Sequence, residues 1–137
     1  MFGQGVTGSS KNVPQWILDI TREVEEKHGF CTSGIYYKEA KQKDYYRGCY
    51  YVNKKIIDLY FSPEKNNEAI FVLLHELTHA WQHLECPCTL TKISKGKRKV
   101  NHNKEFFLFA KKLYERYGVL DIAIQREYKR GRKYIVK

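Results

Sequence analysis

The stretch AIFVLLHELTHAWQHLE, residues 69–85, places His75, Glu76 and His79 within a run of apolar, helix-favouring residues. On a helix, a spacing of four residues puts both imidazoles on one face, about 6 Å apart along the axis. A nitrogen of each imidazole could then lie about 2.0–2.1 Å from a single zinc ion. Glu76, rotated by about 100°, could take a proton from water that the zinc acidifies. The spacing therefore predicts metal-assisted hydrolysis with Glu76 as the general base.

An alternative is that these three polar residues are exposed on a helix surface or satisfied by neighbouring groups. The residues around them are apolar, since residues 70–74 and Leu77 contain only Ile, Phe, Val and Leu. A helix buried on most of its surface seldom carries two imidazoles and a carboxylate without partners, because unpartnered buried polar groups are costly. The surroundings therefore favour a metal site over a chance match to a short motif.

A catalytic zinc also needs a third protein ligand and one open coordination position. The candidates are His83, His102 and Glu105. His83 continues the helical row, but it lies about 12 Å along the axis from His75, too far for one ion to bind all three histidines. Glu105 would suit zinc enzymes that use a glutamate ligand. His102 is the best candidate, because it precedes a predicted helix that could pack against the motif helix.

Hydrophobic periodicity and turn signals predict one α+β domain at residues 13–118. Residues 1–12 are expected to form a flexible N-terminus. Residues 119–137 are expected to form a basic C-terminal extension, with a short helix and then a tail that could end in a strand at 133–137. Helices are predicted at 13–28, from a cap at Ser62 or Asn66 to residue 85, and at 103–117, and strands at 32–38, 45–52 and 55–61.

The whole chain has a formal net charge of +10, and its positive charge is concentrated in the last third. Residues 92–137 contain 15 Lys and Arg against 4 Asp and Glu, whereas residues 1–91 contain 10 against 11. This asymmetry predicts a polyanionic partner, DNA or RNA, bound without sequence specificity. The alternative is a solvated basic surface that only aids solubility. The predicted nucleic-acid contacts are Lys92, Lys95, Lys97, Arg98, Lys99, Arg126, Lys129, Arg130, Arg132 and Lys133.

The N-terminus and the four cysteines indicate the cellular compartment in which the protein is expected and the state of its thiols. No basic region followed by an apolar core opens the chain, so we expect no secretory signal, and a cytoplasmic or nuclear protein. No apolar run approaches the roughly 20 residues of a membrane helix, so no membrane partner is expected; we also expect a monomer. Buried thiols are the favoured state, ahead of a second metal site or a disulfide. The cysteines are Cys31, Cys49, Cys86 and Cys88.

The sequence LLHELTHAWQH, followed by NHNKEFFLFAKKLYERYG, resembles the SprT-like (Spartan-type) zinc metalloprotease domain. That family combines the HExxH motif with a downstream histidine in a context such as H-G-x-E-F/W. The matching residues here are 102–106, with Asn103 in place of the glycine. The order of the predicted helices and strands also fits, so the resemblance covers roughly residues 13–118.

This resemblance implies a zincin-like fold of the minigluzincin or SprT-like type, in which a small antiparallel sheet packs against the HExxH helix and flanking helices. It implies a metalloprotease that hydrolyses peptide bonds, by analogy on proteins bound or crosslinked to DNA. An extended substrate peptide is expected along the strand KKIIDLYF, residues 54–61, unless that strand is only part of the core. The implied site has one catalytic Zn²⁺ bound by His75, His79 and His102, and Glu76 as general base.

Two other functions remain open. A metal-dependent nuclease could use the same three histidines on a basic surface. A non-enzymatic nucleic-acid-binding module could instead hold a structural zinc, whose fourth position would be closed by Cys86 or Cys88.

Overall fold

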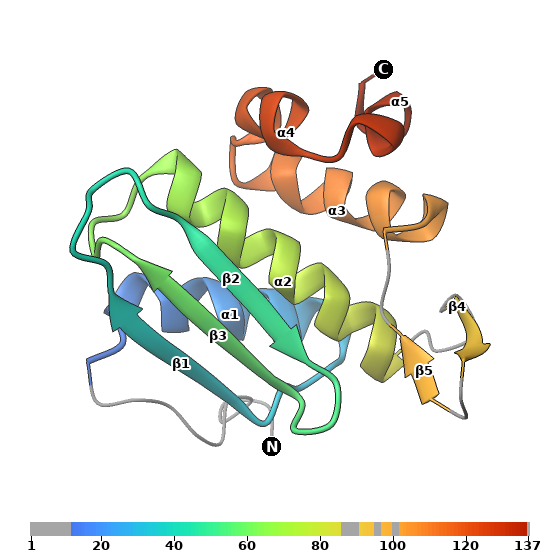
Figure 1. Ribbon diagram of the computed structural model, residues 1–137, viewed down its shortest axis with the longest axis horizontal. Helices are drawn as coiled ribbons and strands as arrows, with labels where there is room; N and C mark the ends of the chain where they lie inside the picture. Colours follow the sequence, from blue (N-terminus) through green and yellow to red (C-terminus); the bar gives the residue numbers. More distant parts are fainter. Residues whose placement is uncertain (1–11, 86–90, 95–96, 100–101, 137) are drawn as a thin grey trace.

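The computed structural model describes residues 12–85, 91–94, 97–99 and 102–136, with side chains described for 12–85 and 102–136. The flexible N-terminus predicted for residues 1–12 lies outside these ranges except for its last residue. The described chain is a small α+β domain, which confirms the predicted class (Figure 1). In chain order its elements are α1 (Gln15–His28), β1 (Gly34–Glu39), β2 (Arg47–Tyr51), β3 (Ile56–Phe61), α2 (Asn67–Glu85), β4 (Thr91–Ser94), β5 (Lys97–Lys99), α3 (Lys104–Arg116), α4 (Leu120–Arg126), the 3₁₀ helix η3 (Lys129–Gly131) and α5 (Arg132–Ile135).

The main sheet is mixed, which corrects the antiparallel sheet expected from the sequence. β2 and β3 form an antiparallel hairpin, but β1 pairs with β3 in parallel, so the strand order is β1-β3-β2. β3 suits the central position because Ile57, Leu59 and Phe61 are all buried, whereas Tyr50 is the buried residue of β2. In the described sheet β3 therefore has no free edge, so the substrate-binding role expected for residues 54–61 is wrong and the alternative of a core strand is confirmed. The edge nearest α2 belongs to β2.

Helices cover one face of this sheet (Figure 1). Trp16 of α1 stacks on Phe61 of β3, with ring centroids 6.2 Å apart, and α2 contacts both β2 and β3. On its opposite side α2 contacts α3 and α4. The motif helix is thus the central element of the domain, between the sheet and the C-terminal helices.

The central helix, α2, begins at a side-chain cap and is buried along most of its length. The Oδ1 atom of Asn66 accepts a hydrogen bond of 2.9 Å from the Ala69 N–H, as the sequence predicted. Twelve of its 19 residues are buried, so most polar groups on this helix must find partners inside the protein. Neither α2 nor any other helix in the described ranges is long and apolar enough to cross a membrane.

The C-terminal segment, residues 119–136, packs onto α3. Both α4 and α5 contact that helix, and Ile135 is fully buried. Gly131 lies so close to the Phe107 ring that an added Cβ would come within 2.0 Å of it. The strand considered for residues 133–137 is wrong, because residues 132–135 form α5. This segment therefore contributes to the core and can carry side chains to α2.

Two of the four cysteines lie in the described part of the chain, and both correct the expectation of buried thiols. Cys31 and Cys49 are both exposed. Cys31 follows α1 in the loop to β1, and Cys49 points away from α2 because its neighbours Gly48 and Tyr50 face that helix. Cys86 and Cys88 lie outside the described residues.

Candidate metal centre

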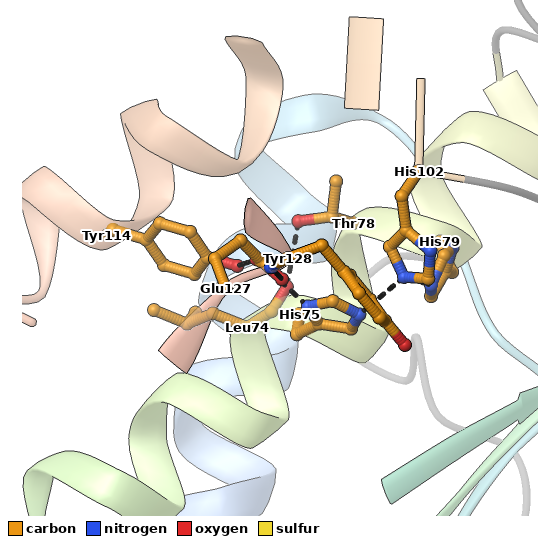
Figure 2. Close-up of polar contacts among 8 residues, drawn as sticks. All are labelled: Leu74, His75, Thr78, His79, His102, Tyr114, Glu127 and Tyr128. Atoms are coloured by element: carbon orange, nitrogen blue, oxygen red, sulfur yellow. Dashed lines mark hydrogen bonds and ion pairs between the residues drawn. The ribbon is translucent and has the colours of Figure 1, made fainter. Parts of the chain in front are cut away.

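Three histidine side chains converge between α2 and the segment that precedes α3. Nε2 of His102 lies 2.9 Å from Nε2 of His75 and 3.1 Å from Nε2 of His79 (Figure 2). The possible ligand atoms of all three lie within 4.8 Å of one another. His79 is buried, and the other two are half-buried. His102, the candidate third ligand that the sequence favoured, therefore lies beside the two motif histidines.

The position of His102 is fixed by the residue that follows it. Oδ1 of Asn103 accepts one hydrogen bond from the Phe106 N–H, at 2.9 Å, and another from Nε2 of Gln82, at 3.0 Å. The first bond caps α3, and the second joins the start of α3 to α2 three residues beyond His79. Asn103, which stands where the SprT-like family has glycine, thus connects the two helices that carry the histidines.

The three imidazoles fit a single cation. One N–H can serve only one acceptor, so three ring nitrogens that face a common point cannot all be satisfied by hydrogen bonds to one another. A tetrahedral zinc at about 2.0–2.1 Å from each nitrogen would separate them by roughly 3.3 Å, close to the 2.9 and 3.1 Å observed. The donor set is nitrogen only, which zinc accepts readily, as do copper and nickel.

A buried carboxylate, that of Glu127, contacts the ring nitrogen of His75 that faces away from the other two histidines. Oε2 of Glu127 lies 3.0 Å from Nδ1 of His75 and also accepts a hydrogen bond from the Tyr114 hydroxyl (Figure 2). Glu127 is 2% exposed, and its own N–H donates to the Ala123 carbonyl at the end of α4. A carboxylate on the second ring nitrogen is the usual companion of a metal-binding histidine, because it fixes the tautomer and the ring orientation.

Glu76 points toward β2 and lines a pocket together with His75. It is 7% exposed, and a Cβ added at Gly48 would lie 2.9 Å from Cγ of Glu76. Only glycine therefore lets the edge strand approach the carboxylate this closely. A pocket of about 280 Å³ is lined by Gly48, His75 and Glu76 together with Tyr128.

Burial and the neighbouring charges separate the pKa values of the three histidines. Burial, followed by the charges of His75 and His102, lowers the pKa of His79 to about 2. Burial and the charge of His75 lower the pKa of His102 to about 4. Burial also lowers the pKa of His75, but the hydrogen bond and charge of Glu127, with the charge of Glu76, outweigh it and leave the pKa raised. Two of the imidazoles are thus held neutral, which is the state that binds a metal.

The two glutamates of the site are shifted in opposite directions. Burial raises the pKa of Glu76, against a lowering by the charge of His75. Burial also acts to raise the pKa of Glu127, but hydrogen bonds from His75 and Tyr114 and the charge of His75 outweigh it and leave that pKa lowered. Glu127 is therefore held as an anion, whereas Glu76 is the carboxylate more ready to accept a proton.

The two other candidate ligands lie outside the cluster. Glu105 is exposed on the first turn of α3. Nδ1 of His83 lies 2.8 Å from the Tyr50 hydroxyl, so this histidine joins α2 to the edge strand. Among the described residues, the group with metal-binding spacing contains neither of them.

The basic residues predicted between the two halves of the site belong to a small hairpin. β4 and β5, which contain Lys92 and residues 97–99, pair in antiparallel fashion. Their side chains and the whole of Lys95 lie outside the description, so the contacts proposed for Lys92, Lys95, Lys97, Arg98 and Lys99 stay predictions. The hairpin connects α2 to α3, and these are the helices that bear the histidines.

Several of the basic residues predicted in the C-terminal segment have partners within the protein. Arg126 forms an ion pair with Glu68 at the start of α2, at 2.5 Å. Arg132 donates to the Gln125 carbonyl at 3.0 Å, and the Lys133 ammonium lies 5.1 Å from the centre of the Tyr134 ring. Lys129 and Arg130 are exposed and have no partner among the described side chains, which leaves these two the most available for an anionic ligand.

Sequence reasoning missed Glu127, Tyr114 and Tyr128 as residues of the site. None of the three is among the candidate residues, and Glu127 enters only as one of the four acids in residues 92–137. One signal was present, since Glu127 is the single acid among the basic residues of QREYKRGRK. An isolated acid in such a run is a candidate for a specific partner, but the sequence does not say which.

Comparisons of the chain with protein-family models, with curated proteins and with solved structures find no match. The resemblance to the SprT-like domain rests on the residues of its two motif segments, 75–79 and 102–106, and on the order of the elements. The described residues bring together three histidines, with the buried Glu76 and Glu127 beside them.

Proposed function

We propose that this chain is a zinc-dependent metallopeptidase of the SprT-like kind, with a zincin-like fold, that hydrolyses peptide bonds in proteins bound or crosslinked to DNA. The observation that carries the proposal is the convergence of three Nε2 atoms, from His75, His79 and His102, on one point. Three protein ligands leave a fourth position open, as catalytic zinc requires, whereas structural zinc is usually closed by four.

The side chains around the cluster have the properties that peptide hydrolysis requires. Zinc bound by the three imidazoles would supply a Lewis acid that polarises a carbonyl group and acidifies water. Glu76, adjacent in sequence to His75 and buried in the same pocket, takes the proton of the attacking water. The water oxygen bonds to the carbonyl carbon, the C–N bond breaks, and Glu76 passes the proton to the leaving nitrogen. A carboxyl group with a raised pKa suits both transfers.

The substrate strand is proposed to pair with the free edge of β2. In the described sheet β2 pairs with β3 on one side only. Gly48 of β2 lines the pocket that contains Glu76, so a peptide extended along this edge would pass beside the general base. Backbone pairing binds a strand with little demand on its sequence, which suits an enzyme that must act on varied proteins.

A second hollow adjoins this pocket. It has a volume of about 490 Å³ and shares Phe71, Val72 and Arg126 with the pocket at the cluster. Asp44 and Tyr46, which precede β2, line its far end. The shared floor is largely apolar, so we expect it to accept substrate side chains on one side of the scissile bond.

Proximity to nucleic acid is supported by charge and gives a second candidate function. Arg130 is exposed, and its positive charge is close enough to contribute to the lowered pKa of His102. A phosphate bound by Lys129 and Arg130 would therefore lie near the cluster. The same observation supports a nuclease, in which the three histidines would hold a metal beside a phosphodiester.

The variant Glu76→Gln separates the two functions. The purified, zinc-loaded protein is incubated with casein, with a DNA-bound protein and with radiolabelled DNA, and cleavage is measured with zinc content. We expect the wild type to cleave protein and leave DNA intact, and the variant to lose proteolysis while it keeps its zinc. The control is Glu85→Gln, because Glu85 is an exposed residue of the same helix.

Two results would overturn the proposal. Full activity of the Glu76→Gln variant would show that Glu76 is not the general base. Cleavage of DNA without cleavage of protein would favour the nuclease. The nucleic-acid arm has its own readout, since binding through phosphates weakens steeply as salt is raised. If added DNA does not change protein cleavage at any salt concentration, the proposal that the substrates are DNA-bound proteins fails, although the peptidase activity itself stands.

A further inference from the structure

We propose that Tyr128 is a catalytic residue of this site, whose hydroxyl donates a hydrogen bond to the carbonyl oxygen of the scissile peptide as that oxygen becomes negatively charged. This inference rests on the proposed peptidase function. Addition of water to a peptide carbonyl moves the electrons of the C=O double bond onto the oxygen. A donor placed in advance at that oxygen is commonly the largest single contribution to such reactions.

The ring of Tyr128 lies directly over the histidine cluster. Its centroid is 4.3 Å from that of His102 and 6.4 Å from that of His75. Figure 2 shows the ring crossing in front of His75, with its hydroxyl at the end away from the backbone. Tyr128 and Glu76 line the same pocket of about 280 Å³. A peptide carbonyl at the cluster would therefore meet the phenol and the general base together.

The other tyrosines near the pocket already have partners. The Tyr114 hydroxyl is buried and donates to Glu127. The Tyr50 hydroxyl is joined to Nδ1 of His83 at 2.8 Å, and the Tyr46 hydroxyl accepts from Nδ2 of Asn66 at 3.1 Å. Within the described part of the chain, the Tyr128 hydroxyl has no hydrogen-bond partner, and the side chain is 52% exposed. It is thus the phenol that remains available to a substrate.

The backbone of Tyr128 is held on both sides, although its side chain is exposed. Its N–H donates to Oε1 of Glu127 at 3.4 Å, and its carbonyl accepts from the Gly131 N–H at 2.9 Å. The Glu127 carboxylate is in turn bonded to His75. The carboxylate that bonds to His75 therefore also holds the backbone of the residue that bears the phenol, so His75 and Tyr128 are positioned by one side chain.

The test compares Tyr128→Phe with the wild type in steady-state cleavage of a fluorogenic peptide. Phenylalanine keeps the ring over His102 and removes only the hydroxyl. We expect kcat to fall by roughly 10²–10³-fold with KM and zinc affinity unchanged, as for loss of one oxyanion donor. The control is Tyr36→Phe, because Tyr36 is 38% exposed and lies on β1, away from the cluster.

A second readout does not depend on turnover. A phosphinic pseudopeptide, whose tetrahedral centre carries an anionic oxygen like that of the transition state, is titrated by calorimetry into the zinc-loaded Glu76→Gln protein with and without Tyr128→Phe. We expect the additional change to weaken binding by roughly 10²-fold. Equal affinity, or a loss of zinc on removing the hydroxyl, would overturn the assignment.

The outcomes distinguish this inference from the function on which it rests. If the wild type neither cleaves protein nor binds the pseudopeptide, the proposed peptidase function fails, and the role of Tyr128 with it. If the wild type cleaves protein and Tyr128→Phe cleaves it equally well, the role of Tyr128 alone fails. A defect in nucleic-acid binding by Tyr128→Ala, with kcat unchanged in Tyr128→Phe, would also overturn the catalytic role and favour base stacking.

Discussion

Oε2 of Glu127 lies 3.0 Å from Nδ1 of His75, although 52 residues separate them in the chain. The bond joins the C-terminal segment to the motif helix and makes residues 119–136 part of the site. It also fixes His75 with Nε2 toward His79 and His102, which is the orientation that a shared metal ion needs.

Removing this carboxylate should weaken metal binding. For Glu127→Ala we expect zinc affinity to fall by about 10–100-fold, the usual effect of losing a partner of a metal-binding histidine. Glu127→Gln should lose less, because its amide oxygen can still accept from His75. Competition with a chromophoric chelator measures both, with Glu115→Ala on the exposed side of α3 as the control. Unchanged affinity in Glu127→Ala would mean that His75 is oriented by other contacts.

The docking of the C-terminal segment can be tested at a glycine. In Gly131→Ala the new Cβ would lie 2.0–2.4 Å from three atoms of the Phe107 ring. We expect a loss of about 1–3 kcal/mol in the free energy of unfolding, as for other overpacked cores, and weaker zinc binding as Glu127 moves. Thermal denaturation and chelator competition measure the two effects.

The matched control for that variant is Gly118→Ala. Gly118 has φ +72° at the end of α3, with no atom near an added Cβ. Alanine there should cost about 1–2 kcal/mol of stability through its left-handed backbone and leave zinc affinity unchanged. If both alanines weakened zinc binding equally, general destabilisation would explain the result and the docking argument would fail.

The close approach of β2 to Glu76 predicts a catalytic defect without metal loss. A Cβ at Gly48 would lie 2.8 Å from Cγ1 of Val72 and 2.9 Å from Cγ of Glu76. We expect Gly48→Ala to displace Glu76, the proposed general base, and to lower kcat by about 10²-fold, with zinc still bound. Cys49→Ala, the adjacent change on the opposite face of β2, should have no such effect. Full activity in Gly48→Ala would show that the strand can move away at no cost.

Glu25 of α1 provides a pH dependence that is independent of the metal site. Its Oε2 accepts from the N–H and the hydroxyl of Thr32, and its Oε1 has no partner among the described residues. Burial raises the pKa of this carboxyl, outweighing those hydrogen bonds. The folded state thus favours the protonated acid, so the contribution of Glu25 to stability is full below the unfolded pKa near 4.5 and is lost as pH rises through the folded value.

Replacing Glu25 by glutamine should therefore raise the free energy of unfolding relative to the wild type, and this gain should be larger at pH 7 than at pH 4. The amide oxygen can still accept from Thr32, and no charge is buried. Denaturant unfolding across this pH range measures the difference, with Glu26→Gln, exposed on the same helix, as the control. A difference that is constant with pH, or that grows on acidification, would contradict the raised pKa.

The sequence could predict the helix that carries the motif and the third histidine, because both depend on short-range patterns. The spacing of His75 and His79 fixes a common face once the segment is helical. His102 follows from its position before a second helix whose apolar stripe, from Phe106 to Leu113, must be buried.

What could not be predicted depends on how elements pack over long separations. The strand before the motif helix could be either a substrate-binding strand or a core strand, and β3 is central, because strand order is not set by chain order. Glu127 and Tyr128 reach the site only through the packing of α4 and α5 on α3. No local pattern in the sequence around them specifies that His75 would be their neighbour.

X-ray absorption at the zinc edge, measured on the purified zinc-loaded protein, tests the central claim most directly. We expect one zinc per chain with three imidazole nitrogens and one water oxygen near 2.0–2.1 Å, no sulfur, and loss of the bound metal in His102→Ala. A zinc ion coordinated by cysteine sulfur, or zinc retained unchanged in His102→Ala, would contradict the open three-histidine site.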